Sequence, residues 1–203
     1  MRVLSRFVMS ASDASQFPAP ALPEVAFLGR SNVGKSSVIN ALLGKKLAKT
    51  SSTPGRTRSI NFFEVRWPGK PNPEVMFTDL PGYGWARISR ETSQSWASFI
   101  DPYLKERISL ALCLALIDIN VPPQELDRQM AEFLRDTGRP YITVATKSDR
   151  LSGNQLRNAI HTLSGAYPSA KILPFSARTG LGQNELWQEI RQAVEQHREP
   201  LQK

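Results

Sequence analysis

The sequence predicts an α/β fold in which a mainly parallel six-stranded sheet, with one antiparallel strand, is covered by helices on both faces. Three observations predict this fold. Short apolar runs alternate with segments of helical periodicity along most of the 203 residues. The turn-rich stretch PGKPNP joins the second and third apolar runs too closely for anything but an antiparallel pair. Polar motifs follow the ends of several runs, where such sheets bind ligands.

The elements are expected in the following order. Residues 1–22 form a lead-in segment with room for a short strand or turn, and residues 23–203 form one domain. The predicted strands cover residues 24–29, 60–67, 74–80, 109–118, 140–147 and 170–177. The predicted helices cover residues 34–44, 93–107, 123–137, 152–164 and 182–197.

The composition is that of a soluble globular protein, with 40% hydrophobic and 22% charged residues. The longest uninterrupted apolar run, Leu110 to Ile117, has eight residues, whereas a membrane helix needs about 20. The amino-terminal stretch lacks the sustained apolar core of a signal peptide, and neither end carries a lipidation motif. We therefore expect a cytoplasmic protein, with no membrane contact, that is a monomer.

The net charge of +8 is concentrated in the amino-terminal half. Residues 1–100 hold 13 Lys and Arg against 6 Asp and Glu, whereas residues 101–203 hold 13 against 12. Such asymmetry indicates a polyanionic partner facing the first half. Charge alone is equally compatible with a simple role in solubility.

A phosphate-binding loop is predicted directly after the first strand of the domain. The motif GRSNVGKS fits the pattern G-x-x-x-x-G-K-[ST] and comprises Gly29, Arg30, Ser31, Asn32, Val33, Gly34, Lys35 and Ser36. Its backbone N–H groups would face the phosphates, Lys35 would reach the β- and γ-phosphates, and the Ser36 hydroxyl would ligate Mg²⁺. The alternative is an ordinary glycine-rich turn between strand and helix.

Two later motifs indicate that the base is guanine. ATKSD supplies Thr146, Lys147, Ser148 and Asp149, and FSA supplies Phe175, Ser176 and Ala177. The Asp149 carboxylate can accept hydrogen bonds from the N1–H and the exocyclic amino group of guanine, a pair of donors that adenine lacks. Lys147 can lie along the base plane, and the Ala177 amide can meet the guanine O6.

The motif DLPG and the loop before the second strand are expected to sense the γ-phosphate. DLPG comprises Asp79, Leu80, Pro81 and Gly82, and the loop STPGRTRS includes Gly55, Arg56, Thr57, Arg58 and Ser59. Asp79 would hold Mg²⁺ through water, Thr57 would ligate it directly, and the Gly82 amide would touch the γ-phosphate. The alternative for the loop is a flexible solvated segment.

Together, the stretches PEVAFLGRSNVGKSSVINAL, STPGRTRSINFF, DLPGYGWA, TKSD and FSA resemble the EngB (YihA/YsxC) GTPases over nearly the whole chain. The resemblance implies a Ras-like P-loop GTPase fold, GTP or GDP with Mg²⁺ as ligands, and Lys35, Thr57 and Gly82 as catalytic residues. It also implies a role in assembly of the large ribosomal subunit and a family-level link to septation. Thr146 stands where other GTPases carry Asn. We expect this to remove an amide that ties the base loop to the phosphate loop, and therefore to give modest nucleotide affinity.

The resemblance implies slow hydrolysis, because Tyr83 occupies the position at which Ras-like GTPases carry a water-orienting glutamine. Related GTPases with Asn at the position of Asn32 bind K⁺ beside the β- and γ-phosphates. We expect K⁺ near Asn32, together with carbonyl groups around Gly55 and Arg56. The alternative is that Asn32 only shapes the loop. Tyr83 is interpreted as part of a surface that faces a partner.

Two basic segments are the predicted contacts with the precursor of the large ribosomal subunit, which presents ribosomal RNA and ribosomal proteins. Residues 45–58 carry five Lys and Arg residues and no acidic residue, and residues 82–90 interleave aromatic residues with arginines. Both features suit irregular RNA. Each charged segment alone is more typical of a solvated face, but both coincide with the segments expected to sense the γ-phosphate. Two other readings remain open, a GTPase read by protein effectors and a P-loop kinase. The kinase does not explain TKSD and FSA.

Overall fold

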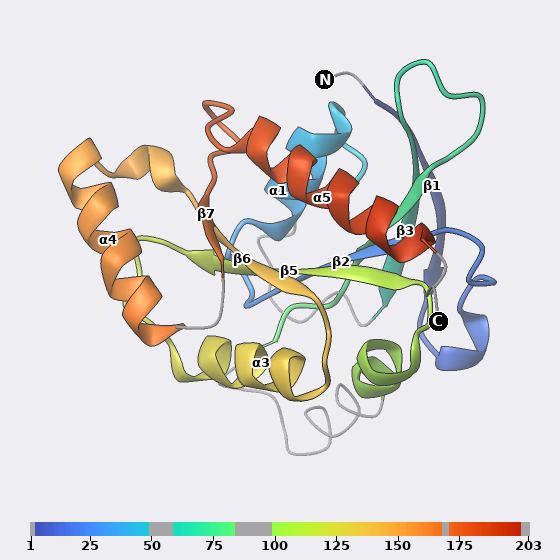
Figure 1. Cartoon of the computed structure of the whole chain (residues 1–203), viewed down its shortest axis with the longest axis horizontal. Coiled ribbons are helices and arrows are strands. Elements are labelled where there is room, and N and C mark those ends of the chain that lie inside the picture. Colours follow the sequence, from blue (N-terminus) through green and yellow to red (C-terminus); the bar gives the residue numbers. More distant parts are fainter. Residues whose placement is uncertain (1–2, 49–58, 84–98, 168–170, 200–203) are drawn as a thin grey trace.

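The computed structural model of the protein describes residues 3–48, 59–83, 99–167 and 171–199. The described residues form one seven-stranded sheet with the strand order β1-β3-β4-β2-β5-β6-β7 (Figure 1). The strands are β1 (Leu4–Ala11), β2 (Glu24–Gly29), β3 (Ile60–Arg66), β4 (Val75–Asp79), β5 (Leu110–Asp118), β6 (Tyr141–Thr146) and β7 (Ile172–Pro174).

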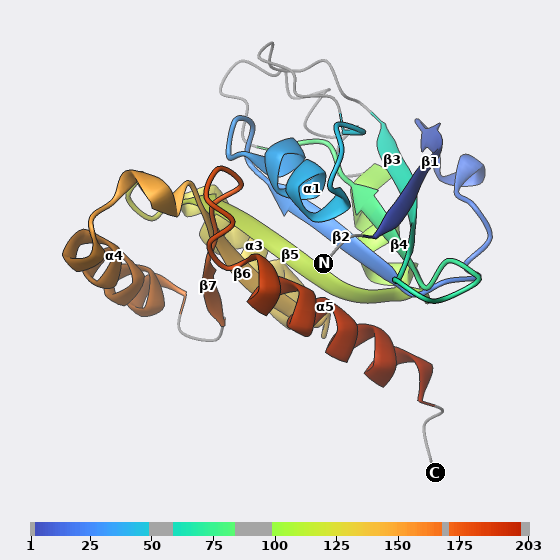
Figure 2. The same cartoon turned by 90° about the horizontal axis from the view of Figure 1, so that it is seen from above.

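Helices cover both faces of the sheet. They are α1 (Lys35–Leu43), α3 (Glu125–Asp136), α4 (Gly153–Ala166) and α5 (Gln183–Arg198), and residues 99–106 are also helical. Helices α1 and α5 lie on one face, α3 and the helical residues 99–106 lie on the other, and α4 lies at the β7 end (Figures 1 and 2). No helix within the described ranges is long and apolar enough to cross a lipid bilayer.

The central strands fill two cores because successive side chains of a strand point to opposite faces. In β2, Val25 and Phe27 join the core under α1 and α5, whereas Ala26 and Leu28 join the core on the opposite face. All four side chains are at most 1% exposed. This burial on both faces explains why the strand is an unbroken apolar run in the sequence.

The predicted strand count of six is wrong, because the lead-in segment contributes the edge strand β1. It pairs antiparallel with β3, from Leu4 opposite Arg66 to Ala11 opposite Ile60, with a register shift between Phe7 and Met9. β1 mixes serine and arginine with apolar residues, and its partner lies far along the chain. Among the described strands, β3 alone runs in the opposite direction to all the others, and it is antiparallel to both of its neighbours, β1 and β4. The single antiparallel strand is therefore confirmed.

The other predicted elements are mostly confirmed. The strands expected at 24–29, 60–67, 74–80, 109–118 and 140–147 are present to within one residue at each end. The last strand is shorter than the predicted 170–177 and ends at Pro174, which cannot donate to the sheet. The helices expected at 34–44, 123–137, 152–164 and 182–197 are α1, α3, α4 and α5. Residues 99–106 confirm the later part of the helix expected at 93–107, and residues 93–98 lie outside the described residues.

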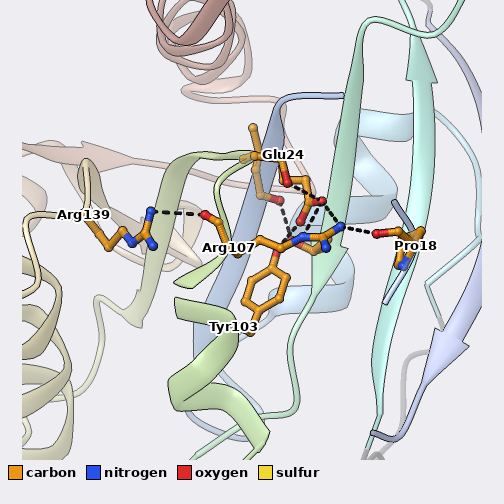
Figure 3. Close-up of polar contacts among 8 residues, drawn as sticks. Pro18, Glu24, Tyr103, Arg107 and Arg139 are labelled. Atoms are coloured by element: carbon orange, nitrogen blue, oxygen red, sulfur yellow. Dashed lines mark hydrogen bonds and ion pairs between the residues drawn. The ribbon is translucent and has the colours of Figure 1, made fainter. Parts of the chain in front are cut away.

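A buried carboxylate holds the amino end of β2 in place (Figure 3). Glu24 is 1% exposed, and its carboxylate accepts hydrogen bonds from Arg107 at 2.5 and 2.9 Å, from the Tyr103 hydroxyl at 2.7 Å and from the Ser109 hydroxyl at 2.8 Å. Arg107 also donates to the carbonyl of Pro18 at 2.7 Å. The sheet, the end of the helix at 99–106 and the segment after β1 therefore meet at one charge pair.

Candidate nucleotide-binding site

The loop between β2 and α1 has the backbone shape of an anion-binding turn. Asn32 and Gly34 have left-handed backbone angles, with φ of 64° and 102°, and such residues turn successive N–H groups toward one side of a loop. Gly34 precedes α1, and no side chain caps the N–H groups at this end of the helix. Such N–H groups and the helix dipole favour the binding of an anion. Residues 29–36 thus have the shape that phosphate binding requires, and the phosphate role itself stays a prediction.

The predicted phosphate lysine and the predicted magnesium carboxylate lie together. The ammonium group of Lys35, at the start of α1, forms an ion pair with the carboxylate of Asp79, at the end of β4. Only 13% of the lysine side chain and 7% of the aspartate side chain are exposed. Parallel pairing of β2 with β4 brings the two motifs to the same edge of the sheet. Ser36 follows Lys35 in the first turn of α1.

The end of the DLPG motif is docked on the phosphate loop. The N–H of Tyr83 donates to the carbonyl of Gly29 at 3.2 Å, and the N–H of Ser31 donates to the carbonyl of Tyr83 at 3.3 Å. A Cβ on Gly82 would lie 3.1 to 3.3 Å from the hydroxyl oxygen and backbone of Ser31, so a side chain at this position would push against the phosphate loop. Leu80, predicted as a binding residue, has its side chain fully buried in the core.

The interpretation of Tyr83 as a partner-facing residue is wrong. Its side chain is 8% exposed, and its hydroxyl donates a 3.0 Å hydrogen bond to Asp127 on α3. Burial raises the pKa of the Tyr83 hydroxyl well above its usual value and also raises the pKa of Asp127, although Arg30 opposes both shifts. A tyrosine that packs into the core on one side of a sheet cannot present its ring to a partner.

The base loop is tied to the phosphate loop in spite of the threonine. The Thr146 hydroxyl lies 2.6 Å from the carbonyl of Val33 and 2.9 Å from that of Ile117. A hydroxyl has one hydrogen to donate, so these two carbonyls share it. Lys147 adds a second tie, since its ammonium donates to the carbonyl of Asn32 at 2.8 Å. The two loops are therefore connected without the amide, because a hydroxyl takes its place, and the expectation of modest nucleotide affinity stays a prediction.

A cavity of about 420 Å³ lies between the base loop, the phosphate loop and the turn after β7. The predicted residues that line it are Gly34, Thr146, Lys147, Asp149, Phe175 and Ala177. The carboxylate of Asp149 accepts hydrogen bonds from the Ser176 hydroxyl at 2.6 Å and from the Arg178 guanidinium at 2.7 Å. These two donors hold the pKa of the Asp149 carboxyl below its usual value, so that it stays ionised at neutral pH. Ser148 is buried and donates to the carbonyl of Ala145.

Four predicted residues of the loop before β3 lie outside the described residues, namely Gly55, Arg56, Thr57 and Arg58. Ser59 is described and directly precedes β3.

Sequence reasoning missed three residues of the site: Asp118, Asp127 and Arg178. Asp118 accepts a 2.6 Å hydrogen bond from Lys147. It ends β5, so the rule that found Asp79 at a strand end applied to it as well. Asp127 and Arg178 had no such signal.

Comparison with known proteins identifies the family. Residues 24–147 match the model of the 50S ribosome-binding GTPase family. The chain is 58% identical over 194 residues to the probable GTP-binding protein EngB of Koribacter versatilis, and the match covers 96% of each chain. The chain belongs to the EngB family of GTPases. The EngB relative from Acidobacterium capsulatum is 56% identical over 202 residues, which is 99% of this chain and 96% of the relative.

Solved structures share the fold. A probable EngB superimposes with a TM-score of 0.66 at 21% identity, over 85% of this chain and 99% of the other, which shows the shared fold. Era in complex with MgGDPNP and nucleotides 1506–1542 of 16S ribosomal RNA gives a TM-score of 0.69 at 26% identity, over 85% of this chain and 57% of Era. As an EngB family member, the chain binds GTP and hydrolyses it.

Proposed function

We propose that this EngB family GTPase is a slow GTP-dependent switch that acts in the cytoplasm in assembly of the large (50S) ribosomal subunit. The observation that carries the proposal is the match of residues 24–147 to the 50S ribosome-binding GTPase family. The rRNA-bound Era structure supports RNA as the kind of partner. A link to septation belongs to the same proposal, and cell length after depletion of the protein measures it.

In the proposed nucleotide site, the phosphates lie on residues 29–36 and the guanine base lies in the cavity beside Asp149. This is supported by the left-handed residues of the loop, by the ionised carboxylate of Asp149 and by the hydrogen bonds of Thr146 and Lys147 that join the two halves. Slow turnover is supported by the burial of Tyr83, whose hydroxyl is bonded to Asp127 and therefore does not orient a water molecule.

The residues that would hold Mg²⁺ are Ser36, Asp79 and, outside the described residues, Thr57. The donor set fits this ion, since Mg²⁺ prefers hydroxyl and carboxylate oxygens and keeps several waters. Asp79 also lies close to Ser36, because it forms an ion pair with the neighbouring Lys35. Mg²⁺ would neutralise charge on the β- and γ-phosphates. A potassium ion near Asn32, which the family resemblance implies, would add positive charge at the same place, and Asn32 is exposed on the loop, where an ion can reach it.

GTP turnover measured in K⁺ or in Na⁺ buffer tests the role of the monovalent ion. We expect turnover to be at least about tenfold faster in K⁺, and up to the roughly hundredfold effect that one preorganised donor has on a developing charge in a transition state. Asn32→Ala should remove the difference, and EDTA should suppress turnover in both buffers. Identical rates in K⁺ and Na⁺, with and without ribosomal particles, would contradict the potassium site.

The proposed partner surface consists of residues 45–58 and 82–90. In the described part, Lys45 and Lys46 are both exposed, and the ammonium of Lys45 contacts the carbonyl of Ser5. Since Tyr83 is buried, the remaining contacts of the second segment fall to residues 84–90, which lie outside the described residues. Basic residues that neutralise RNA phosphates give binding that weakens with salt.

Co-sedimentation with precursors of the large subunit tests the partner. The form bound to a GTP analogue should co-sediment at low salt, and raising the salt from 50 to 200 mM should weaken binding by at least about tenfold if several phosphates are contacted. Mature small subunits serve as the control particle. Equal binding of the GDP and GTP-analogue forms would argue against a nucleotide-dependent switch, and salt-independent binding would argue against RNA.

A further inference from the structure

The residue that follows Gly82 is fixed at two points. Its backbone is hydrogen-bonded to the phosphate loop through Gly29 and Ser31, in a parallel bridge between Arg30 and Tyr83. Its side chain packs toward α3, where the hydroxyl donates a 3.0 Å hydrogen bond to Asp127. Tyr83 therefore links the phosphate loop to α3 across the end of the DLPG motif.

Asp127 is well placed as the acceptor in this link. It lies in the first turn of α3 and is only 8% exposed. The Tyr83 hydroxyl is its hydrogen-bond partner, and the charge of Arg30, from the phosphate loop, also acts on it. The α3 helix packs against β5, the neighbour of β2 in the sheet, so Asp127 is carried by a fixed part of the fold.

The segment between Asp79 and Tyr83 has little room to move while this contact is made. Leu80 is fully buried and its N–H donates to the carbonyl of Phe27 at 3.2 Å. Gly82 approaches Ser31 so closely that a Cβ would lie 3.1 Å from the hydroxyl oxygen. The position of the Gly82 amide is thus set by a buried anchor before it and by Tyr83 after it.

We propose that the Tyr83–Asp127 hydrogen bond positions the Gly82 amide for the γ-phosphate, and that Asp127 is a positioning residue for GTP recognition and hydrolysis. The inference rests on the proposed nucleotide site. GDP has no γ-phosphate, so losing the hydrogen bond should leave GDP affinity unchanged while weakening GTP. Tyr83, at the position of the usual water-orienting glutamine, thereby positions the backbone amide of Gly82 and does not orient the attacking water.

The test compares Tyr83→Phe and Asp127→Ala with Asp127→Asn. The first two remove the hydrogen bond, and the affinity for a non-hydrolysable GTP analogue relative to GDP should fall at least about tenfold, together with kcat. Asp127→Asn should stay within about twofold of the wild type, because the amide oxygen still accepts from the Tyr83 hydroxyl. The double variant Tyr83→Phe/Asp127→Ala should be no worse than either single variant, because both remove the same interaction.

Tyr103→Phe is the matched control, since it removes another buried hydroxyl bonded to a carboxylate in the same core, at Glu24. An unchanged ratio of GTP-analogue to GDP affinity in Tyr83→Phe and Asp127→Ala would overturn the proposal, as would an equal fall of the ratio in Tyr103→Phe. Failure of the wild-type protein to bind GDP would overturn the nucleotide site itself, and this inference with it.

Discussion

Replacing Asp149 with asparagine should lower GDP affinity at least about hundredfold and create a preference for xanthine nucleotides. An ionised carboxylate only accepts hydrogen bonds, which matches the two donors on the guanine edge. The asparagine amide presents one acceptor and one donor, and xanthine carries a carbonyl where guanine carries the amino group. In the structure, Ser176 and Arg178 hold the carboxylate of Asp149, and Asp149 and Ala177 line the same cavity.

Competition of GDP, XDP and ADP against a fluorescent nucleotide measures the exchange of specificity. Asp118→Asn is the control, because Asp118 also ends a strand and binds Lys147 but does not line the cavity beside Asp149. The control variant should keep its preference for GDP over XDP. Unchanged GDP affinity in Asp149→Asn would show that the base binds elsewhere.

Replacing Arg107 with alanine should reduce the free energy of unfolding by about 3–5 kcal/mol. The Glu24 carboxylate is 2% exposed in its side chain and would lose its only ion-pair partner among the described residues. Tyr103 and Ser109 still donate to it, but two neutral hydroxyls do not balance a buried charge. Arg107→Ala would also free the carbonyl of Pro18 (Figure 3).

Urea unfolding of the purified variants measures this loss. Arg128→Ala is the control, because its pair with Glu125 is about half exposed on both sides and should contribute less than about 1 kcal/mol. Adding Glu24→Gln to Arg107→Ala removes the unpaired charge and should recover part of the loss. A cost no larger than that of Arg128→Ala would contradict a structural role for the buried pair.

Local patterns were enough to predict most of the elements and the strand ends that form the site. The phosphate loop could be found because its glycines, lysine and serine are consecutive and lie between an apolar run and a helical pattern. Asp149 and Ser176 could be placed beside it because parallel strands bring their carboxyl ends to one edge. None of these inferences required a contact between distant residues to be known in advance.

Contacts between distant residues account for what the sequence did not reveal. The sequence allowed a short strand within residues 1–22 but did not place β1 in the sheet, because an edge strand is stabilised by its partner, and that partner, β3, lies far along the chain. The hydroxyl of Thr146 replaces an amide only because the carbonyl of Val33 happens to lie within 2.6 Å. Arg178 and Asp149 are likewise joined by the fold and not by spacing.

The motif DLPGYG shows where the two sources of information divide. Its residues alone predict a γ-phosphate sensor without the usual glutamine, because Asp79 and Gly82 have the required spacing after a strand. The same residues suggested a tyrosine exposed to a partner, since an aromatic residue among arginines is typical of a binding surface. Only the tertiary structure shows that Tyr83 is buried against α3, because the carboxylate that holds its hydroxyl lies 44 positions along the chain.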